Sequence, residues 1–297
     1  MIRCIKNCDL CGSSVENNSM ELASSLFDQY GIKSDIHILM CKHCKYIFQQ
    51  EEFSPDMLDK LYKQDNGYDP SLDIKQTDIF LRNKSKRQKV ITSAIDLAGL
   101  AGEESLNVLD VGGGIGEITE HLADKNKVYL ADLNSSEPIR PEIIKINKSF
   151  EEIDLVKKFD VIVMNHVLEH TYSPSKFLEK AHELLTDKGI IVIEVPFELY
   201  TPMLFKRTGD WRHVAYFSTK VLKNFLNKTG FKALKLKLST SHYHLRTITV
   251  IRAIAQKEEL GQEQLNNKSS YYNLIWDSLN PKALLHYMKS QIKKISK

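Results

Sequence analysis

Four cysteines near the N-terminus have the spacing of ligands to one metal ion. They form two C-x2-C pairs, Cys8 with Cys11 and Cys41 with Cys44. Two tight turns of this kind bring four thiolates to tetrahedral positions, which is the ligand set of structural zinc, and Gly12 suits the first turn. His37 and His43 are alternative ligands that the paired spacing favours less. Because four protein ligands leave no open position, we expect Zn²⁺ with a structural role in a zinc-ribbon-like domain over residues 1–50.

A glycine-rich segment in the middle of the chain has the composition of a ligand-binding turn. The apolar run Val108–Val111 leads into four closely spaced glycines: Gly112, Gly113, Gly114 and Gly116. Ile118, Leu122 and Ala123 then recur with helical spacing. This order predicts a strand, a turn and a helix. Without Cβ atoms the turn can press its amides against a ligand, and the N-terminus of the helix would add a positive dipole end.

An aspartate after the next predicted strand indicates which ligand the turn would bind. Lys127–Leu130 predicts that strand, and Asp132 follows it, 22 residues after Asp110. A carboxylate at this point can accept hydrogen bonds from both hydroxyls of a ribose. A dinucleotide-binding turn would have its third glycine where Glu117 stands, so the pattern disfavours a nicotinamide dinucleotide.

The segment resembles motif I of the class I methyltransferases that use S-adenosyl-L-methionine (AdoMet), in which an acidic residue precedes three alternate glycines. The matching positions are Asp110, Gly112, Gly114 and Gly116. The resemblance implies that Asp110 lies near the amino-acid end of the cofactor and Asp132 near its ribose. A loop after the third predicted strand, Lys145–Asn147, would lie at the edge of the adenine. The implied cofactor contacts are Asp110, Gly112, Gly113, Gly114, Gly116, Asp132, Leu133, Ser149, Phe150 and Asn165. For Phe150, a place in the hydrophobic core is the alternative.

Two further blocks resemble the same group of enzymes. HVLEH, from His166 to His170, follows a predicted buried strand over Phe159–Met164. HVAYFS, from His213 to Ser218, comes after the fifth predicted strand, Ile190–Val195. Together with the cysteine pairs, these blocks resemble the zinc-containing sugar methyltransferases. That group includes C-methyltransferases of deoxysugar nucleotides and relatives in surface-polysaccharide pathways.

The resemblance implies an acceptor and a catalytic base. The sugar C-methyltransferases carry Tyr-x-Glu-His where this chain has Asp210-Trp211-Arg212-His213 and keeps only the histidine. Transfer to a hydroxyl needs one base, because the sulfonium supplies the electrophile, so O-methylation of a sugar fits better than C-methylation. His213 is the first candidate base, and His166, at the edge of the fourth predicted strand, is the second.

The same histidines could instead hold a second metal ion. HVLEH places His166, Glu169 and His170 on one helical turn, and His213 could join them. Related small-molecule O-methyltransferases and RNA-end methyltransferases with E-x-x-E-H at this place bind a divalent ion, and the resemblance extends that expectation here. His166 replaces the first glutamate of their pattern. The structural alternative is that Glu169 and His170 hold the turn together.

The order of the predicted elements indicates an α/β fold. We expect a Rossmann-like class I methyltransferase sheet, mostly parallel with an antiparallel last strand, beside the small N-terminal zinc-binding domain. The last two strands are predicted over 231–238 and 247–253, after a helix over 219–229 that Ser218 caps and Gly230 ends. The expected segments are a zinc-ribbon-like domain over 1–50, a linker and helical cap over 51–104, the AdoMet-binding domain over 105–255, and a polar linker with a basic amphipathic helix over 256–297.

Composition and charge limit the partners. The chain has 297 residues, of which 42% are hydrophobic, and its net charge of +3 is too small to argue for nucleic acid. The resemblance implies a small-molecule or glycan substrate. RNA methylation is the alternative function, in which the zinc ribbon and the basic segment Arg82–Lys89, with its five positive charges, would bind RNA; a solvated helix face would also explain those charges. A degenerate zinc scaffold without catalysis is a third alternative, which the intact glycines and Asp132 disfavour.

The sequence also bears on location. No apolar run reaches the ~18 residues of a membrane span, and the N-terminus lacks a signal-peptide pattern, so we expect a cytoplasmic protein. The basic amphipathic pattern of 281–297 could rest on the inner face of a membrane, or pack on protein. The sequence leaves the oligomeric state, the sugar and the methylated position open.

Overall fold

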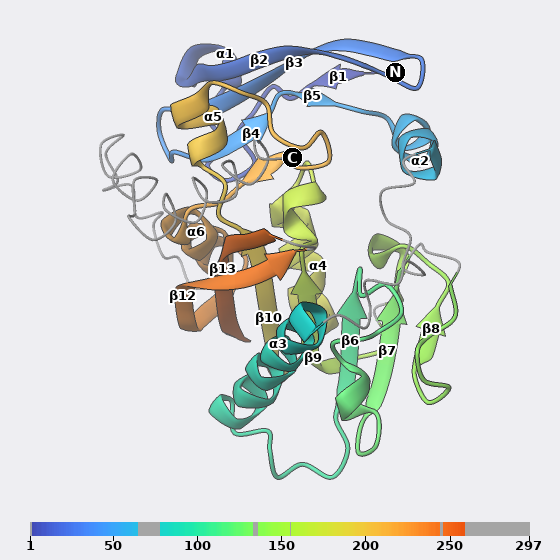
Figure 1. The fold of residues 1–297 in the computed structure, drawn as a ribbon. Coiled ribbons are helices and arrows are strands. Elements are labelled where there is room, and N and C mark those ends of the chain that lie inside the picture. Colours follow the sequence, from blue (N-terminus) through green and yellow to red (C-terminus); the bar gives the residue numbers. More distant parts are fainter. Residues whose placement is uncertain (1, 65–77, 133–135, 155, 244–245, 259–297) are drawn as a thin grey trace.

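The computed structural model describes residues 2–64, 78–132, 136–154, 156–243 and 246–258 (Figure 1). Three expectations lie outside the described residues, namely the cofactor contact of Leu133, the polar linker beyond residue 258 and the basic helix over 281–297. Within the described part of the chain, no helix is long and apolar enough to cross a membrane.

A seven-stranded sheet forms the centre of the molecule, in the order β12-β13-β10-β9-β6-β7-β8. Its strands are β6 (Asn107–Val111), β7 (Lys127–Ala131), β8 (Ile144–Ile146), β9 (Phe159–Asn165), β10 (Leu185–Pro196), β12 (Phe231–Tyr243) and β13 (Arg246–Lys257). The pairs among β6, β7, β8, β9 and β10 are parallel, whereas β13 runs antiparallel to β10 and β12. The predicted fold class is therefore confirmed.

Helices cover both faces of this sheet, which explains the apolar runs of its central strands. Val108, Val161 and Ile190 are fully buried in one hydrophobic cluster, while their neighbours along each strand belong to a second cluster on the opposite face. The helices are α3 (Asp78–Leu97), α4 (Pro174–Leu184) and α6 (Thr219–Lys228) (Figure 1). The predicted caps of α6 are confirmed, because the Ser218 hydroxyl accepts a hydrogen bond from the Val221 amide and Gly230 has a φ of 81°.

The helix predicted after the glycine turn does not form. Between β6 and β7 the structure has successive turns and one short 3-10 segment, Glu120–Leu122. Gly112, Gly114 and Gly116, which precede this segment, all have positive φ angles, of 62°, 65° and 83°, so no right-handed helix can begin before residue 117. The positive end of a helix dipole is therefore not part of this site. The backbone amides of the turn are the groups that remain to donate hydrogen bonds to a ligand.

Strand bounds near the end of the sheet also differ from prediction. β10 begins at Leu185, five residues before the predicted start at Ile190, and its pairing with β9 shifts register between Leu185 and Ile190. β12 and β13 extend beyond their predicted ends and form a long hairpin. The segment after β10 contains a short helix, α5 (Tyr200–Phe205).

The N-terminal residues form a second sheet that recruits a strand from much later in the chain. Its order is β11-β4-β3-β2, from β2 (Ser19–Gln29), β3 (Ile32–Cys41), β4 (Ile47–Gln49) and β11 (Ala215–Tyr216). The remaining N-terminal elements are α1 (Val15–Asn18), α2 (Pro55–Gln64) and the pair β1 (Arg3–Cys4) and β5 (Glu51–Glu52). In Figure 1 these strands lie above the ends toward which β6, β7 and β8 point.

The two sheets share one hydrophobic core. Tyr46, which follows the second cysteine pair, is fully buried, and its ring centroid lies 5.0 Å from that of Phe225 in α6 and 6.2 Å from that of Phe217. The N-terminal segment is thus packed against the seven-stranded sheet rather than around a core of its own.

Candidate functional site

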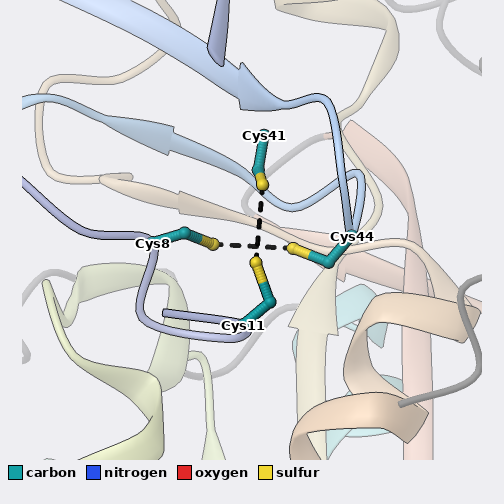
Figure 2. A group of neighbouring side chains, drawn as sticks. All are labelled: Cys8, Cys11, Cys41 and Cys44. Carbon is teal, nitrogen blue, oxygen red and sulfur yellow. Dashed lines mark hydrogen bonds between the residues drawn. The ribbon is translucent and has the colours of Figure 1, made fainter. Parts of the chain in front are cut away.

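The four paired cysteines meet at one point. Cys8 and Cys11 flank the turn before α1, while Cys41 ends β3 and Cys44 lies in the turn before β4. Figure 2 shows the four sulfurs pointing to a common centre. The Cys8 and Cys44 sulfurs are 3.5 Å apart, and those of Cys11 and Cys41 are 3.6 Å apart. Four sulfurs at about 2.3 Å from a tetrahedral zinc lie roughly 3.8 Å from one another, so the donor set and its spacing fit this metal.

The four thiols lie so close together that the protonation state of each affects the pKa of the others. Hydrogen bonds from neighbouring thiols, with burial, raise the pKa of Cys8 and Cys44 above the ordinary range, and similar contacts lower the pKa of Cys11. Four thiolates at this separation repel one another unless a cation lies between them. Gly12, with a φ of 73°, and Lys45, with a φ of 66°, close the two turns.

The glycine turn and Asp132 lie together at the carboxyl ends of β6 and β7. The Gly114 amide donates to Oδ2 of Asp132 at 2.7 Å, and the Gly112 amide donates to the Ala131 carbonyl at 2.8 Å. Because β6 pairs with β7 in parallel, both elements end at the same edge of the sheet. This edge is where open α/β sheets bind ligands. The sequence-based placement of Asp132 beside the glycines agrees with this geometry.

Asp110 is buried beneath the turn rather than exposed on it. Burial raises the pKa of its carboxyl to about 7, and the negative charge of Asp132 adds to this, whereas the hydroxyl of Thr119, which donates to Oδ2 at 2.7 Å, opposes it. Among the described residues, Oδ1 of Asp110 has no hydrogen-bond partner. A Cβ on Gly113 would lie 2.4 to 2.6 Å from the atoms of this carboxyl group, so glycine is required there.

The predicted adenine contacts lie in a tight turn and in the core. The Ser149 hydroxyl and amide both donate to the Glu152 carboxylate at 3.1 Å, in a capping box. The Phe150 ring is buried, with its centroid 5.3 Å from that of Phe177. The structure thus places Phe150 in the core, the alternative that the sequence left open. Asn165 ends β9, and its buried Nδ2 has no partner among the described residues.

His166 is held between two carboxylates. Its Nδ1 lies 3.0 Å from Oε1 of Glu169, and its Nε2 lies 3.2 Å from Oε1 of Glu194. Burial would lower the pKa of His166, but these two hydrogen bonds raise it, so the charged ring is favoured. His166 also has a φ of 55°, an unusual backbone conformation for a non-glycine residue. With both nitrogens engaged, His166 is poorly suited to the base role predicted for it.

Glu194 extends this network into the sheet. Arg87, from α3, donates to its Oε1 at 2.7 Å, and Arg252, from β13, donates to its Oε2. Three cationic side chains therefore surround one buried carboxylate and lower its pKa well below the usual range, against the effect of burial. Glu194 is not among the predicted site residues. Its signal in the sequence is a charged residue within the apolar run IIVIEVP, because acidic side chains are rarely buried in a strand unless they are paired.

His213 and His170 lie together beside Glu169. The two imidazole rings have centroids 5.0 Å apart. Nδ1 of His213 lies 2.7 Å from Oε2 of Glu198, and Nδ1 of His170 lies 2.9 Å from the Arg212 carbonyl. Glu198 is not among the predicted site residues, because only the folded loop brings it to His213.

The electrostatics of this cluster bear on the predicted base. Burial would lower the pKa of His213, but the charge and hydrogen bond of Glu198, with Glu169 and Asp210, raise it to about 9. A neutral ring that accepts a proton is therefore a minor form at pH 7 in the protein alone. Burial would likewise raise the pKa of Glu169, yet its hydrogen bond with His166 and the neighbouring histidines lower it.

A cavity of about 570 Å³ opens between β2 and the segment that precedes His213. Its wall combines aromatic and polar side chains from β2, from the segment before β11 and from β11 itself: Phe27, Asp28, Asp210, Trp211, Arg212 and Tyr216. The Trp211 ring centroid is 6.1 Å from that of Phe27 and 5.4 Å from that of Tyr62. Arg212, which lines the cavity, contacts His170 through its carbonyl, so the backbone connects the cavity wall to the histidine cluster.

The basic segment of α3, Arg82–Lys89, contacts the rest of the protein through several of its side chains, which neither the phosphate-binding nor the solvated-face prediction implied. Lys84 forms an ion pair with Glu120, Lys86 donates to the Thr240 carbonyl, and Arg87 binds Glu194. Three of its five positive charges thus attach the helix to the sheet and the glycine turn. They are neither a solvated face nor a free phosphate-binding patch.

Comparison with known proteins gives the following matches. The sequence profile of a family described as a methyltransferase domain matches residues 84–236. No curated protein sequence matches the chain. A solved 1,6-didemethyltoxoflavin-N1-methyltransferase from Burkholderia thailandensis, with bound 1,6-didemethyltoxoflavin and S-adenosylhomocysteine, aligns with a TM-score of 0.52 and 15% identity. The alignment covers 80% of this chain and all of that one.

A second solved structure is similar to the same extent. It is the magnesium protoporphyrin IX methyltransferase of Synechocystis PCC 6803 with bound S-adenosylhomocysteine, with a TM-score of 0.51 and 16% identity. The alignment covers 69% of this chain and 100% of that protein. At these identities the likeness shows a shared fold and does not choose an acceptor.

Proposed function

The chain belongs to the methyltransferase domain family, and we propose that it transfers the methyl group of AdoMet to a hydroxyl of a sugar. The acceptor would be a nucleotide-sugar or a precursor of a surface polysaccharide or glycolipid. The finer resemblance to zinc-containing sugar methyltransferases rests on the sequence blocks described above. The cavity wall and the cysteine cluster are the structural features that support it.

The carboxyl edge of β6 and β7 would hold the cofactor. Asp132 is positioned to bind the ribose hydroxyls, and the amides of the glycine turn can approach the rest of the ligand closely. When bound there, AdoMet supplies a methyl group already activated by positive sulfur. The two solved methyltransferases that share this fold contain S-adenosylhomocysteine, the demethylated form of this cofactor. The unpartnered Oδ1 of Asp110 fits a nearby positive group on such a ligand.

The cavity beside His213 is the observation that carries the choice of acceptor. Sugars bind proteins through hydrogen bonds to side chains that can donate or accept, and through stacking of their apolar faces on aromatic rings. Trp211 provides a ring at the wall, while Asp28, Asp210 and Arg212 provide polar groups. A volume of about 570 Å³ is within the range of small-molecule sites.

The proposed role of His213 is to accept the proton of the acceptor hydroxyl. Glu198 engages its Nδ1 and so orients the ring, leaving Nε2 for the other side. Methyl transfer needs in-line positioning above all, and the hydroxyl proton must leave as the new bond forms. His213 can take that proton only in the fraction of molecules with a neutral ring.

Zinc in the cysteine cluster would have a structural role in this scheme. It would join the turn before α1 to the turn between β3 and β4, and β4 pairs with β11 directly after His213. The metal would thereby stabilise the sheet that carries one wall of the cavity.

The experiment is transfer of an isotope-labelled methyl group from AdoMet into a fractionated cell extract. We expect label in the nucleotide-sugar or glycolipid fraction. The label should be reduced about a hundredfold by His213→Ala and nearly unchanged by His182→Ala, which alters a half-buried histidine on α4, outside the proposed site. Label in nuclease-sensitive RNA, suppressed by added salt, would instead overturn the sugar assignment. The inward contacts of the α3 basic segment argue against that outcome.

A further inference from the structure

We propose that the sugar bound in the cavity between β2 and the segment before β11 carries a positively charged amino group, and that no phosphate enters this cavity with it. The inference rests on the proposed function, because it names the class of acceptor that the same site would take. It is carried by the charges, hydrogen-bond acceptors and aromatic rings of the cavity wall.

The charged side chains of the wall favour a cation over an anion. Among the described residues that line the cavity, Asp28, Asp210 and Arg212 are charged, which leaves one net negative charge. The Arg212 guanidinium donates to both oxygens of Asp210, from Nε at 2.9 Å and from Nη2 at 2.6 Å. Arginine binds phosphates with the same two-pronged geometry, so Asp210 occupies the face of Arg212 that a phosphate would need.

The uncharged polar side chains add a hydrogen-bond acceptor. Gln49 is 1% exposed, and its side-chain nitrogen donates to the Glu51 carbonyl at 2.7 Å. Because a carbonyl can only accept, this bond fixes which end of the amide is nitrogen, and Oε1 is the acceptor that remains. The hydroxyls of Ser25 and Thr208, 2.7 Å apart, bond to each other. The hydroxyl and ammonium groups of an amino sugar supply donors to such a wall, whereas the phosphates of a nucleotide-sugar supply only acceptors.

Trp211 adds an aromatic surface to the same wall. Its ring centroid lies 6.1 Å from that of Phe27, which also lines the cavity, and 5.4 Å from that of Tyr62 in α2. Cations are attracted to the faces of aromatic rings, most strongly to tryptophan. The cavity therefore offers an ammonium group both a ring and carboxylates, while the apolar face of the sugar can stack on the rings.

Lys33 is the cation of the protein that lies near Asp28. Its Nζ is 3.7 Å from Oδ2 of Asp28, and the two side chains are 68% and 59% exposed. Ion pairs between side chains this exposed contribute little, because water screens them. Lys33 is not among the residues that line the cavity, so an ammonium group inside the cavity can compete for Asp28.

The charge of the wall also reaches the proposed base. Burial lowers the pKa of His213, but the charge and hydrogen bond of Glu198 raise it, and the charge of Asp210 adds to that increase. A positive amino group bound beside Asp210 would offset this contribution and lower the pKa of His213 again. The acceptor would thus increase the fraction of molecules in which His213 is neutral and can take the hydroxyl proton.

The test repeats the labelled methyl transfer with extract whose free amino groups have been acetylated. Acetic anhydride in bicarbonate buffer acetylates amines, and mild base then removes acetyl groups from oxygen; the control extract receives the base alone. Acetylation removes the positive charge and keeps the sugar. We expect label in the sugar fraction to fall about tenfold or more. Equal label from acetylated and control extract would overturn the proposal.

Substitutions in the wall connect this result to the cavity. Asp28→Asn and Asp210→Asn should each reduce transfer from the control extract about five- to tenfold, with the KM for AdoMet unchanged. Asp35→Asn, which removes an exposed carboxylate of β3 outside the cavity wall, is the matched control and should have no effect. Transfer by well-folded Asp28→Asn and Asp210→Asn that equals transfer by the parent would reject the cavity as the amino-group site.

A phosphate-bearing probe tests the second half of the proposal. UDP-glucose, added as a competitor, should inhibit transfer by the parent weakly, and transfer by Asp210→Asn at about a tenfold lower concentration, because the substitution releases Arg212. Inhibition of the parent as strong as that of Asp210→Asn would contradict the exclusion of phosphate.

This inference and the proposed function fail in different ways. Label in nuclease-sensitive RNA would reject the sugar acceptor and the amino group with it. Label in the sugar fraction that survives acetylation would keep the sugar acceptor and reject only its amino group.

Discussion

Asp110→Asn should remove a large part of the pH dependence of stability in the cofactor-free protein. The Asp110 carboxyl is fully buried, and burial raises its pKa from the ordinary 3.8 to about 7. Between these values the unfolded chain has released this proton and the folded chain has not. Rising pH therefore favours unfolding, by about 1.4 kcal/mol for each pH unit. Over the whole interval the stability lost amounts to roughly 4 kcal/mol. Asparagine has nearly the same shape and cannot ionise.

The assay is urea denaturation of both proteins at half-unit steps from pH 4.5 to pH 8. The free energy of unfolding of Asp110→Asn, minus that of the parent, should rise with pH and level off near pH 7. Other titrating groups are common to both proteins and cancel in this difference. Asp160→Asn is the matched control. It removes a carboxylate of the same sheet. The two oxygens of that Asp160 carboxylate accept hydrogen bonds from the Asn107 amide and the Thr186 hydroxyl.

Parallel stability curves for Asp110→Asn and the parent would refute the reasoning. They would mean that the carboxyl is solvated or already paired in solution. A saturating concentration of S-adenosylhomocysteine adds a second comparison. If the positive amino group of this ligand lies near Oδ1, it should flatten the slope of the parent, because a nearby positive charge lowers the pKa of Asp110.

Four other substitutions have defined outcomes. Cys41→Ser should reduce zinc, measured by atomic absorption, from about one ion per chain to near zero and lower the melting temperature; full retention of zinc would exclude a four-thiolate site. Asp132→Ala should weaken AdoMet binding by about tenfold or more in calorimetry, with zinc content unchanged, and an unaltered affinity would remove Asp132 from the ribose role. Gly113→Ala should cost about 1–3 kcal/mol in urea denaturation, since its Cβ would meet the Asp110 carboxyl at 2.4 Å; a stability equal to the parent would show that the turn can yield. Trp211→Ala should raise the KM for the acceptor about tenfold and leave that for AdoMet unchanged, whereas equal changes in both would argue against a cavity specific to the acceptor.

Local patterns predicted much of the fold because their physical causes act over short stretches of chain. The apolar run Phe159–Met164 became β9, and Ser218 and Gly230 bound α6 as expected. The exception is the segment after the glycines. There, the spacing of Ile118, Leu122 and Ala123 predicted a helix, but the chain forms successive turns and one 3-10 segment.

The sequence by itself determined which residues could do chemistry: the paired cysteines, the glycine turn with Asp132, and the histidines of HVLEH and HVAYFS. Spacing within one turn or one strand suffices for these, because neighbours in sequence are then neighbours in space. Only the tertiary structure decided how they are used. It brought Glu198 into contact with His213 and Arg87 into contact with Glu194. It also paired β11 with β4 of the N-terminal sheet. Such contacts join elements far apart in the chain, so they depend on packing of the whole core, which no local pattern encodes.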